Sequence, residues 1–168
     1  MLKDFIKKRV LFNFDKYFDR REKYFKTKNR IVKWYLLFWI KKQNERMSAD
    51  IYIDSKMERD VFESRPQFNP HGINGIVIAC GARIGKNCRI SHQVTIGSSM
   101  DGRPTIGDNV YIGPGEKIFG GIKIGNNVRI GANCPVFFDV PDNATVVLPK
   151  PRIIVKDANY EYYTVNEK

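Results

Sequence analysis

The segment IVIACGARIGKNCRISHQVTIG (residues 76–97) decides the fold, because an aliphatic residue returns in it every six positions. The same spacing resumes in TIGDNVYIGPGEKIFGGIKIGNNVRIGANCPVF (residues 105–137). Ten positions carry the repeat: Ile78, Ile84, Ile90, Ile96, Ile106, Ile112, Ile118, Ile124, Ile130 and Val136. A period of six fits neither a helix nor an uninterrupted strand, so it predicts short strands separated by regular corners.

Three six-residue units close one triangular coil, so each aliphatic residue is predicted to stack on its counterpart one coil further along the chain. Ile78 should therefore stack on Ile96, which lies 18 residues later. Each such position buries one aliphatic side chain, which stabilises the fold by roughly 1.5–3 kcal/mol. Asn87, Asn109 and Asn127 suit corners that need a positive φ.

The repeat is interrupted once. Ile96 and Ile106 are ten residues apart, so four extra residues must leave the coil within the segment Ser98–Arg103. Insertions in a solenoid map to one face and are often at the binding site. An idle surface loop is the alternative interpretation.

Composition limits the classes of protein. A chain of 168 residues predicts one core with an appendage, and its net charge of +11 is concentrated in residues 1–48, which hold 15 Lys and Arg against five Asp and Glu. Three widely spaced cysteines predict neither a disulfide framework nor a metal site, which fits a reducing cytoplasm. No signal-peptide core is seen, and the longest apolar run, Trp34–Ile40, is far shorter than the roughly 20 residues of a membrane span.

Residues 1–48 are predicted to form one or two amphipathic helices. One helical face is formed by residues at i, i+3, i+4, i+7 and i+8, namely Ile31, Trp34, Tyr35, Phe38 and Trp39. A cationic helix with such a face can lie in the headgroup layer of an anionic membrane. Alternatively, the helices pack on each other or on neighbouring subunits. Nucleic-acid binding is not expected, because no recognised motif accompanies the basic residues.

Five segments carry a resemblance to a known family: PHGINGIVI (70–78), GARIGKNCRISHQVTIGS (81–98), PTIGDNVYIG (104–113), IKIGNNVRIGAN (122–133) and DVPDNATVV (139–147). They resemble the serine acetyltransferase branch of hexapeptide acyltransferases, in particular its short members that serve capsule and exopolysaccharide synthesis. The resemblance implies a mainly β fold, a left-handed parallel β-helix, with an N-terminal α-helical segment. It also implies a homotrimer that binds acetyl-CoA in a groove between adjacent β-helices of the trimer. We therefore expect a helical segment (1–48), an acyltransferase β-helix (49–147) and a C-terminal tail (148–168).

Acetyl transfer to a hydroxyl needs a base, because an alcohol is a poor nucleophile at neutral pH. His71 and His92 are the two histidines of the chain, and both are candidate catalytic residues. The resemblance places the base at His71, in the segment PHG, with a structural role at a corner as the alternative. His92 follows Ile90 by two residues, where a side chain can point outward to contact substrate or CoA. A plain surface histidine is the other interpretation.

The resemblance also implies the remaining site residues. Pro114 and Ala132 match the corners that line the pantetheine channel, and Arg152 or Lys156 would meet the phosphates of CoA. The alternative is a basic tail that packs back on the coil.

Two departures concern the acceptor. Serine-specific members have His-Pro at the end of the inserted loop, where this chain has Arg103-Pro104. They also have a carboxylate 15 residues before the base, where this chain has Lys56; Asp50 and Asp54 are the nearest acids. Arg103 and Asp54 are the candidate substrate-binding residues.

These features predict an acetyl-CoA-dependent O-acetyltransferase whose acceptor is a sugar hydroxyl of a capsular or exopolysaccharide or of its lipid-linked precursor. The enzyme would be cytoplasmic or peripheral at the inner face of the membrane. Serine O-acetyltransferase is the alternative, favoured by the signature but disfavoured by the missing loop histidine and the short N-terminal segment. A non-catalytic β-helix scaffold is a third hypothesis.

Overall fold

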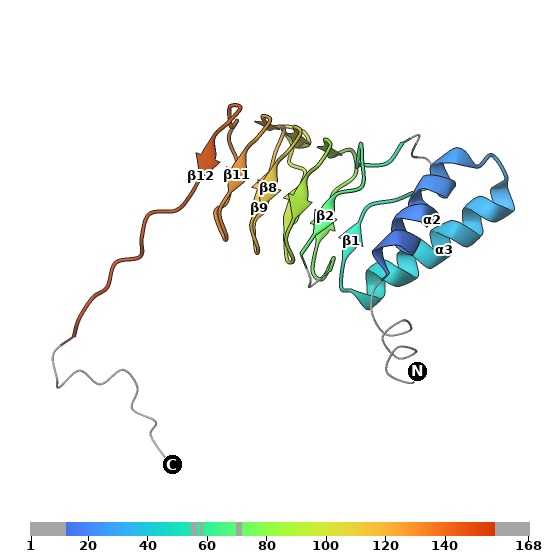
Figure 1. Cartoon of the computed structure of the whole chain (residues 1–168), viewed down its shortest axis with the longest axis horizontal. Coiled ribbons are helices and arrows are strands. Elements are labelled where there is room, and N and C mark those ends of the chain that lie inside the picture. Colours follow the sequence, from blue (N-terminus) through green and yellow to red (C-terminus); the bar gives the residue numbers. More distant parts are fainter. Residues whose placement is uncertain (1–12, 55–56, 58, 70–71, 157–168) are drawn as a thin grey trace, which may run out of the picture.

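Two helices precede a column of short parallel strands in the computed structural model, which describes residues 13–54, 57, 59–69 and 72–156 (Figure 1). The helices are α2 (Phe14–Lys26) and α3 (Arg30–Arg46). The strands are β1 (Asp50–Ile51), β2 (Gln67–Phe68), β3 (Val77–Ile78), β4 (Arg83–Ile84), β5 (Arg89–Ile90), β6 (Thr95–Gly97), β7 (Thr105–Ile106), β8 (Tyr111–Ile112), β9 (Lys117–Phe119), β10 (Lys123–Ile124), β11 (Arg129–Ile130) and β12 (Thr145–Val146).

The strands form the three sides of a triangular coil. Sheet A has the order β1-β3-β6-β9, sheet B the order β10-β7-β4, and sheet C the order β12-β11-β8-β5-β2. The predicted register is confirmed, because Ile78 pairs with Ile96 in parallel strands. Ile96 then pairs with Ile118, four residues beyond the regular step, since the inserted segment lies between them.

Each sheet contributes one inward column of side chains. Twelve of these residues are no more than 8% exposed: Ile51, Ile78, Ile96, Ile118 and Val136 in sheet A, Phe62, Ile84, Ile106 and Ile124 in sheet B, and Ile90, Ile112 and Ile130 in sheet C. The outward neighbours are mostly charged or polar, as the alternation of a strand requires. The six-residue repeat therefore encodes the core of the coil.

The insertion folds into a tight turn at the corner between sheets A and B. Ser99 N donates to Gly102 O at 2.9 Å, and Gly102 N donates back to Ser99 O at 3.2 Å. The turn lies directly on the next coil, because a Cβ on Gly121 would come within 2.3 Å of Asp101 O. The four extra residues thus leave the coil where the sequence predicted.

The two helices cover the N-terminal end of the coil (Figure 1). Both begin at an asparagine cap: Asn13 Oδ1 accepts from Lys16 N, and Asn29 Oδ1 accepts from Ile31 N. Phe18 of α2 packs on the ring of Phe62 at 5.7 Å between centroids. These contacts hide the apolar residues of the first coil from water.

A buried polar network ties α2 to the coil. The guanidinium of Arg21 is fully buried and pairs with the carboxylate of Asp60, with Nε to Oδ2 at 2.7 Å. It also donates to Tyr52 O at 3.2 Å. Tyr17 donates its hydroxyl to Asn44 Oδ1 of α3 at 2.7 Å, so the network joins both helices. Because a buried charge is costly without its partner, this pairing fixes the helices on the coil.

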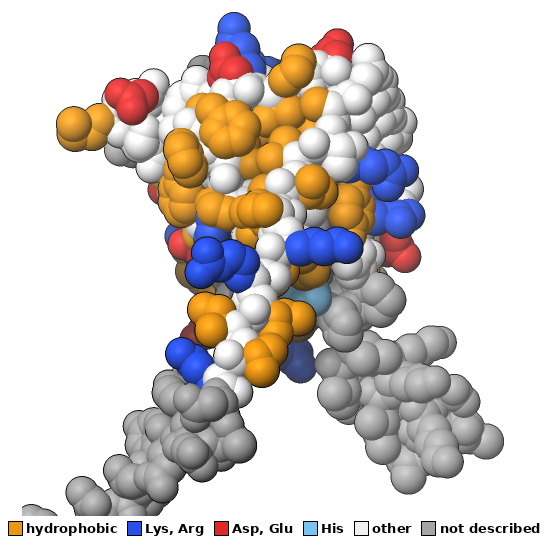
Figure 2. Space-filling model, turned by 90° about the vertical axis from the view of Figure 1, so that its left-hand side faces the viewer, with side chains coloured by type: hydrophobic (Ala, Val, Ile, Leu, Met, Phe, Trp, Pro, Cys, Tyr) orange, Lys and Arg blue, Asp and Glu red, His pale blue; other side chains and the backbone are white. Residues whose placement is uncertain are grey.

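The C-terminal end of the coil is open. Hydrophobic side chains gather on this end of the molecule (Figure 2). Phe137 and Val147 are 71% and 66% exposed. Residues 149–156 run away from the coil (Figure 1).

Neither described helix has the length and apolar character needed to cross a membrane.

Candidate functional site

Three of the eight predicted site residues lie at one edge of the coil, where sheet C turns into sheet A. We call this edge the histidine corner; it comprises the described residues 69, 72–76, 91–94, 113–116 and 131–135. His71 lies outside the described residues, but both of its flanking segments reach this corner.

Backbone hydrogen bonds stack the four turns of the histidine corner on one another. Gln93 N donates to Asn74 O at 2.8 Å, and Gly115 N donates to His92 O at 3.1 Å. Asn133 N donates to Pro114 O at 3.1 Å. The structure therefore brings His92, Pro114 and Ala132 to the same edge as residues 72–76, which follow His71 in the sequence.

The turn that carries His92 is held from both sides. The side chain of His92 is half-buried and its Nδ1 atom is shielded from solvent. Beside it, Asn69 Nδ2 donates to Ser91 Oγ at 2.9 Å, which attaches the segment before residue 70 to this coil. Lys117 Nζ donates to Gln93 O at 3.0 Å and so closes the turn from the following coil. The hydrogen bonds on both sides therefore fix the backbone that carries the imidazole of His92.

Gln93 itself has a backbone φ of +58°, in the left-handed region that disfavours residues with a side chain. Gly115 occupies the corresponding place in the next coil with a φ of +72°, and a Cβ there would lie 2.1 Å from Asn133 Oδ1. Close stacking of these turns therefore requires glycine at residue 115.

A buried carboxylate, which sequence reasoning missed, supports the histidine corner from inside. Glu116 is fully buried. One carboxylate oxygen accepts from Cys134 N at 2.7 Å, and the other accepts from Lys117 N at 3.0 Å. Burial raises the pKa of Glu116 above its usual range. The signal in the sequence was a polar residue in the inward position that Ile76 and Val94 occupy in the coils before it.

The candidate acceptor residues lie at the next edge, where sheet A turns into sheet B. We call it the loop corner; it comprises residues 52–54, 79–82, 97–104 and 119–122. The side chain of Arg103 lies flat over Gly81, since a Cβ there would be 2.5 Å from Arg103 Cδ. Partial burial, with the nearby Asp54 carboxylate, raises the pKa of Tyr52, which also hydrogen-bonds to the exposed Cys80. Arg103 and Asp54 therefore both lie at the loop corner, Arg103 over Gly81 and Asp54 near Tyr52.

The predicted phosphate-binding residues are not brought to either corner. Arg152 and Lys156 lie on the exposed segment 151–156, beyond the last strand. This segment leads away from the coil and from the histidine corner (Figure 1). Within the described part of the chain, the tail does not pack back on the β-helix.

A family model and curated relatives agree on the repeat. Residues 103–134 match the bacterial transferase hexapeptide (six repeats) family. A serine acetyltransferase of Helicobacter pylori is 40% identical over 97 residues, which are 55% of this chain and 56% of that enzyme. One of Mycobacterium tuberculosis is 48% identical over 77 residues, 44% of this chain and 34% of the enzyme. The chain thus spans about half the length of the curated relatives it matches.

Solved structures give the same result. Serine acetyltransferase isoform 3 of Entamoeba histolytica, in complex with cysteine, superposes with a TM-score of 0.59 at 32% identity, covering 73% of this chain and 43% of that one. The Neisseria gonorrhoeae enzyme in complex with serine gives 0.60 at 28% identity, covering 80% and 55%. The predicted fold class, a left-handed parallel β-helix with N-terminal helices, is confirmed.

These similarities overturn the prediction of a saccharide acceptor and of a role in capsule or exopolysaccharide synthesis, because the relatives and structural neighbours are serine acetyltransferases. That prediction relied on a missing loop histidine and on a short N-terminal segment. Length does not separate the two classes, since 97 residues make up 56% of the Helicobacter enzyme, which therefore has about 170 residues. The β-helix of this chain is therefore similar to the bacterial hexapeptide-repeat transferases, and its similarity is to their serine acetyltransferase branch.

Proposed function

We propose that the chain transfers the acetyl group of acetyl-CoA to the hydroxyl of L-serine. The observation that carries this proposal is the shared coil: relatives in sequence and neighbours in structure are both serine acetyltransferases, and one neighbour is a complex with serine. The chain also has two histidines, which fits a reaction that needs a base near neutral pH.

The chemistry assigned to the histidine corner is general base catalysis. His71 accepts the proton of the serine hydroxyl while the oxygen attacks the thioester carbonyl carbon. The C–S bond then breaks, the acetyl group stays on serine, and the CoA thiolate leaves and takes up a proton. His92 contacts the reacting groups from the adjacent coil, because its turn is stacked on the segment that contains His71.

The donor is assigned to the outer surface of the same corner. Pro114 and Ala132 have short side chains on successive coils, which leaves room for a narrow pantetheine chain along the edge. Arg152 and Lys156 carry groups that suit the phosphates of CoA, but their segment leads away from this corner, so this assignment requires the trimer: the two cations would reach the donor bound on a neighbouring copy.

The acceptor is assigned to the loop corner. Arg103 would bind the serine carboxylate, which a guanidinium can hold through two parallel hydrogen bonds, and Asp54 would bind the ammonium group. The two corners lie at opposite ends of the strands of sheet A. A homotrimer with head-to-tail contacts would bring the loop corner of one copy to the histidine corner of the next. We therefore include the trimer in the proposal.

The test is acetyl transfer by the purified full chain with L-serine, followed as loss of the thioester absorbance and as O-acetylserine by mass spectrometry. Absorbance is preferable to thiol reagents because Cys80 is exposed and would react with them. We expect turnover with serine and none with alanine, which lacks the hydroxyl. CoA binding without turnover on serine would contradict the proposal and favour a scaffold.

Two variants assign the residues. His71→Ala should lower kcat/KM by a factor on the order of 10²–10⁴, the usual contribution of a general base. Arg103→Lys should raise KM for serine, since an ammonium cannot replace the planar fork of the guanidinium. Arg83→Lys is the matched control, because Arg83 is also exposed but projects from β4. Equal KM values for the two arginine variants would remove Arg103 from the acceptor site.

A further inference from the structure

Helix α3 exposes an apolar and aromatic face that nothing in the described chain covers. Four side chains form it: Ile31 is 80% exposed, Trp34 70%, Tyr35 55% and Phe38 49%. We call these four residues the aromatic face of α3. The opposite side of the same helix is buried against the rest of the molecule, through Leu36 and Ile40. Large side chains are rarely exposed together in this way unless the surface meets a partner.

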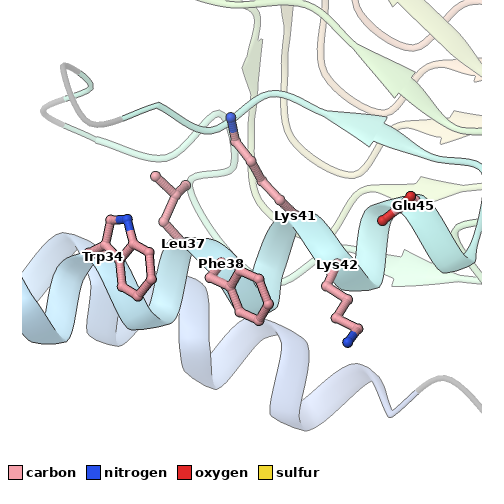
Figure 3. Close-up of a pocket in the computed structure, with 6 residues that line it drawn as sticks. All are labelled: Trp34, Leu37, Phe38, Lys41, Lys42 and Glu45. Atoms are coloured by element: carbon pink, nitrogen blue, oxygen red, sulfur yellow. The ribbon is translucent and has the colours of Figure 1, made fainter.

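Cations surround the aromatic face. A groove of about 650 Å³ on α3 is lined by Trp34, Leu37, Phe38, Lys41, Lys42 and Glu45 (Figure 3). Lys42 Nζ lies 5.8 Å from the ring centroid of Phe38 and 5.5 Å from that of Trp39. Between Arg30 and Asn44 the helix has four Lys and Arg and no acidic residue. The partner that fits this surface is therefore both apolar and anionic.

A second copy of the chain fits this surface poorly. In a symmetric contact, identical faces meet, so Lys41 and Lys42 of one copy would lie near those of the other. Glu45 is the single acid of the groove and cannot neutralise both lysines of the facing helix. Like charges that face each other oppose association, so the charge pattern argues against a symmetric contact between two α3 helices.

A nucleic acid also fits less well than a lipid surface. Trp34 and Phe38 lie nearly parallel on the same helix, with ring centroids 6.2 Å apart and planes 20° apart, which leaves too little space for a base to insert between the two rings with contact on both. The aliphatic Ile31 has no role on a phosphate backbone. Indole and phenol rings with flanking cations do match the headgroup layer, where an apolar body and a polar edge are both satisfied.

We propose that the aromatic face of α3 docks on an anionic lipid bilayer and holds the protein at the membrane surface. Trp34, Phe38 and Ile31 would enter the boundary between headgroups and acyl chains, while Lys41 and Lys42 meet the lipid phosphates. The helix lies at the end of the molecule opposite the C-terminal tail, which leaves the coil directed away from this surface (Figure 1). The inference is independent of the acetyl acceptor.

The experiment uses the full-length protein and its own tryptophans. Trp34 and Trp39 are the two tryptophans of the chain, and both lie on α3, so the emission spectrum reports on this helix alone. Vesicles of phosphatidylcholine, with or without one-quarter phosphatidylglycerol, are titrated at low and at moderate salt. We expect a shift of emission to shorter wavelength and co-flotation with the anionic vesicles alone, both weakened by salt.

Variants locate the contact. Lys41→Glu/Lys42→Glu should lower the partition coefficient more than about tenfold, since each cation near an anionic surface contributes about fivefold. Lys123→Glu/Arg129→Glu changes net charge equally at exposed positions of the coil and should leave binding nearly unchanged. Equal losses in both variants, or no emission shift with either vesicle, would overturn the proposal.

Two further outcomes would assign the face to another partner. If Ile31→Ser/Phe38→Ser lowers the mass measured by sedimentation, the aromatic face covers a second copy and the proposal fails. If a DNA duplex or an RNA hairpin shifts the emission as strongly as anionic vesicles at equal salt, the face binds nucleic acid and the proposal also fails.

Discussion

Two edges of the same coil solve the problem of a tight turn in different ways. At the edge between sheets B and C, which we call the asparagine corner, the left-handed position of each coil is an asparagine: Asn87, Asn109, Asn127 and Asn143. Each side chain bonds to the next: Nδ2 to Oδ1 is 3.3, 3.1 and 3.0 Å along the column. At the histidine corner the equivalent positions hold Gly75, Gln93, Gly115 and Asn133.

The two corners differ in how their turns are stabilised and in which side chains they present outward. The asparagine side chains of this corner are hydrogen-bonded to one another along the column. At the histidine corner the ladder is absent, and the turns rely instead on the buried carboxylate of Glu116 and on the tether from Lys117 to Gln93 O. An edge that presents side chains outward therefore needs its support from the inside.

The largest effect is expected from Glu116→Ala. In the coils before it, the amide that matches Lys117 N donates to a carbonyl of the next coil, as Thr95 N does to Glu116 O at 2.8 Å. Lys117 N and Cys134 N instead bond to the Glu116 carboxylate. Removing it leaves two buried amides without an acceptor, which should lower the free energy of unfolding by about 3–5 kcal/mol. Urea unfolding at fixed protein concentration measures the loss, and a change below about 1 kcal/mol would contradict it.

Glu116→Gln separates the hydrogen bonds from the charge. The amide keeps one acceptor but turns an N–H₂ toward the other backbone N–H, so we expect a loss of about 1–3 kcal/mol. The raised pKa of Glu116 means that the folded state binds a proton more tightly than the unfolded state. The wild type should therefore lose stability as the pH rises from about 4.5 through the raised pKa, and the glutamine variant should lack this component. If the free energy of unfolding has the same pH dependence in the wild type and in Glu116→Gln, the pKa of Glu116 is not raised by burial.

The sequence predicted the coil well because its period is a direct consequence of packing. One aliphatic residue per strand must face inward, so the register of Ile78 on Ile96 could be read from spacing alone. The exit of the inserted loop near Ser98 followed from the same count. The family branch followed from the corner segments, and two of the four predicted CoA residues, Pro114 and Ala132, lie at the histidine corner.

Other features could not be predicted, for physical reasons. The stripe of Ile31, Trp34 and Phe38 has the spacing of a packed face, but α3 buries its opposite side, since spacing defines a face without saying what covers it. The role of Glu116 could not be predicted because it depends on which backbone amides find no carbonyl acceptor in the neighbouring coil. The hydrogen bonds between coils decide this, and they are seen only in the structure. The acceptor was predicted wrongly because a single loop position was given more weight than the similarity of the whole coil.

A smaller effect is expected at the asparagine corner. Asn109→Ala removes two ladder bonds and places a Cβ without polar compensation at a φ of +58°. The left-handed conformation costs about 1–2 kcal/mol for such a residue, so we expect a total loss of about 1.5–3 kcal/mol. Asn109→Gly removes the same bonds without the backbone cost and should lose less than about 1 kcal/mol, the value of two exposed hydrogen bonds. Equal losses in thermal unfolding would show that the ladder, not the turn conformation, stabilises this corner.

The smallest change in stability is expected for Gln93→Gly, at the same φ but at the histidine corner. Glycine relieves a left-handed turn that costs about 1–2 kcal/mol, and the extra freedom of the unfolded chain offsets about 0.4–1 kcal/mol of this gain. The substitution also removes the contact of Gln93 Cγ with the turn at Gly75, which offsets the stabilisation that is left. The free energy of unfolding should therefore change by less than about 0.5 kcal/mol. Activity should nevertheless fall, because this residue follows His92 directly and its rigid turn aims the imidazole. The opposite result would be that Gln93→Gly lowers the free energy of unfolding as much as Asn109→Ala does and leaves the rate of acetyl transfer unchanged. In that case the turns of both corners only stabilise the fold, and the histidine corner has no special role in catalysis.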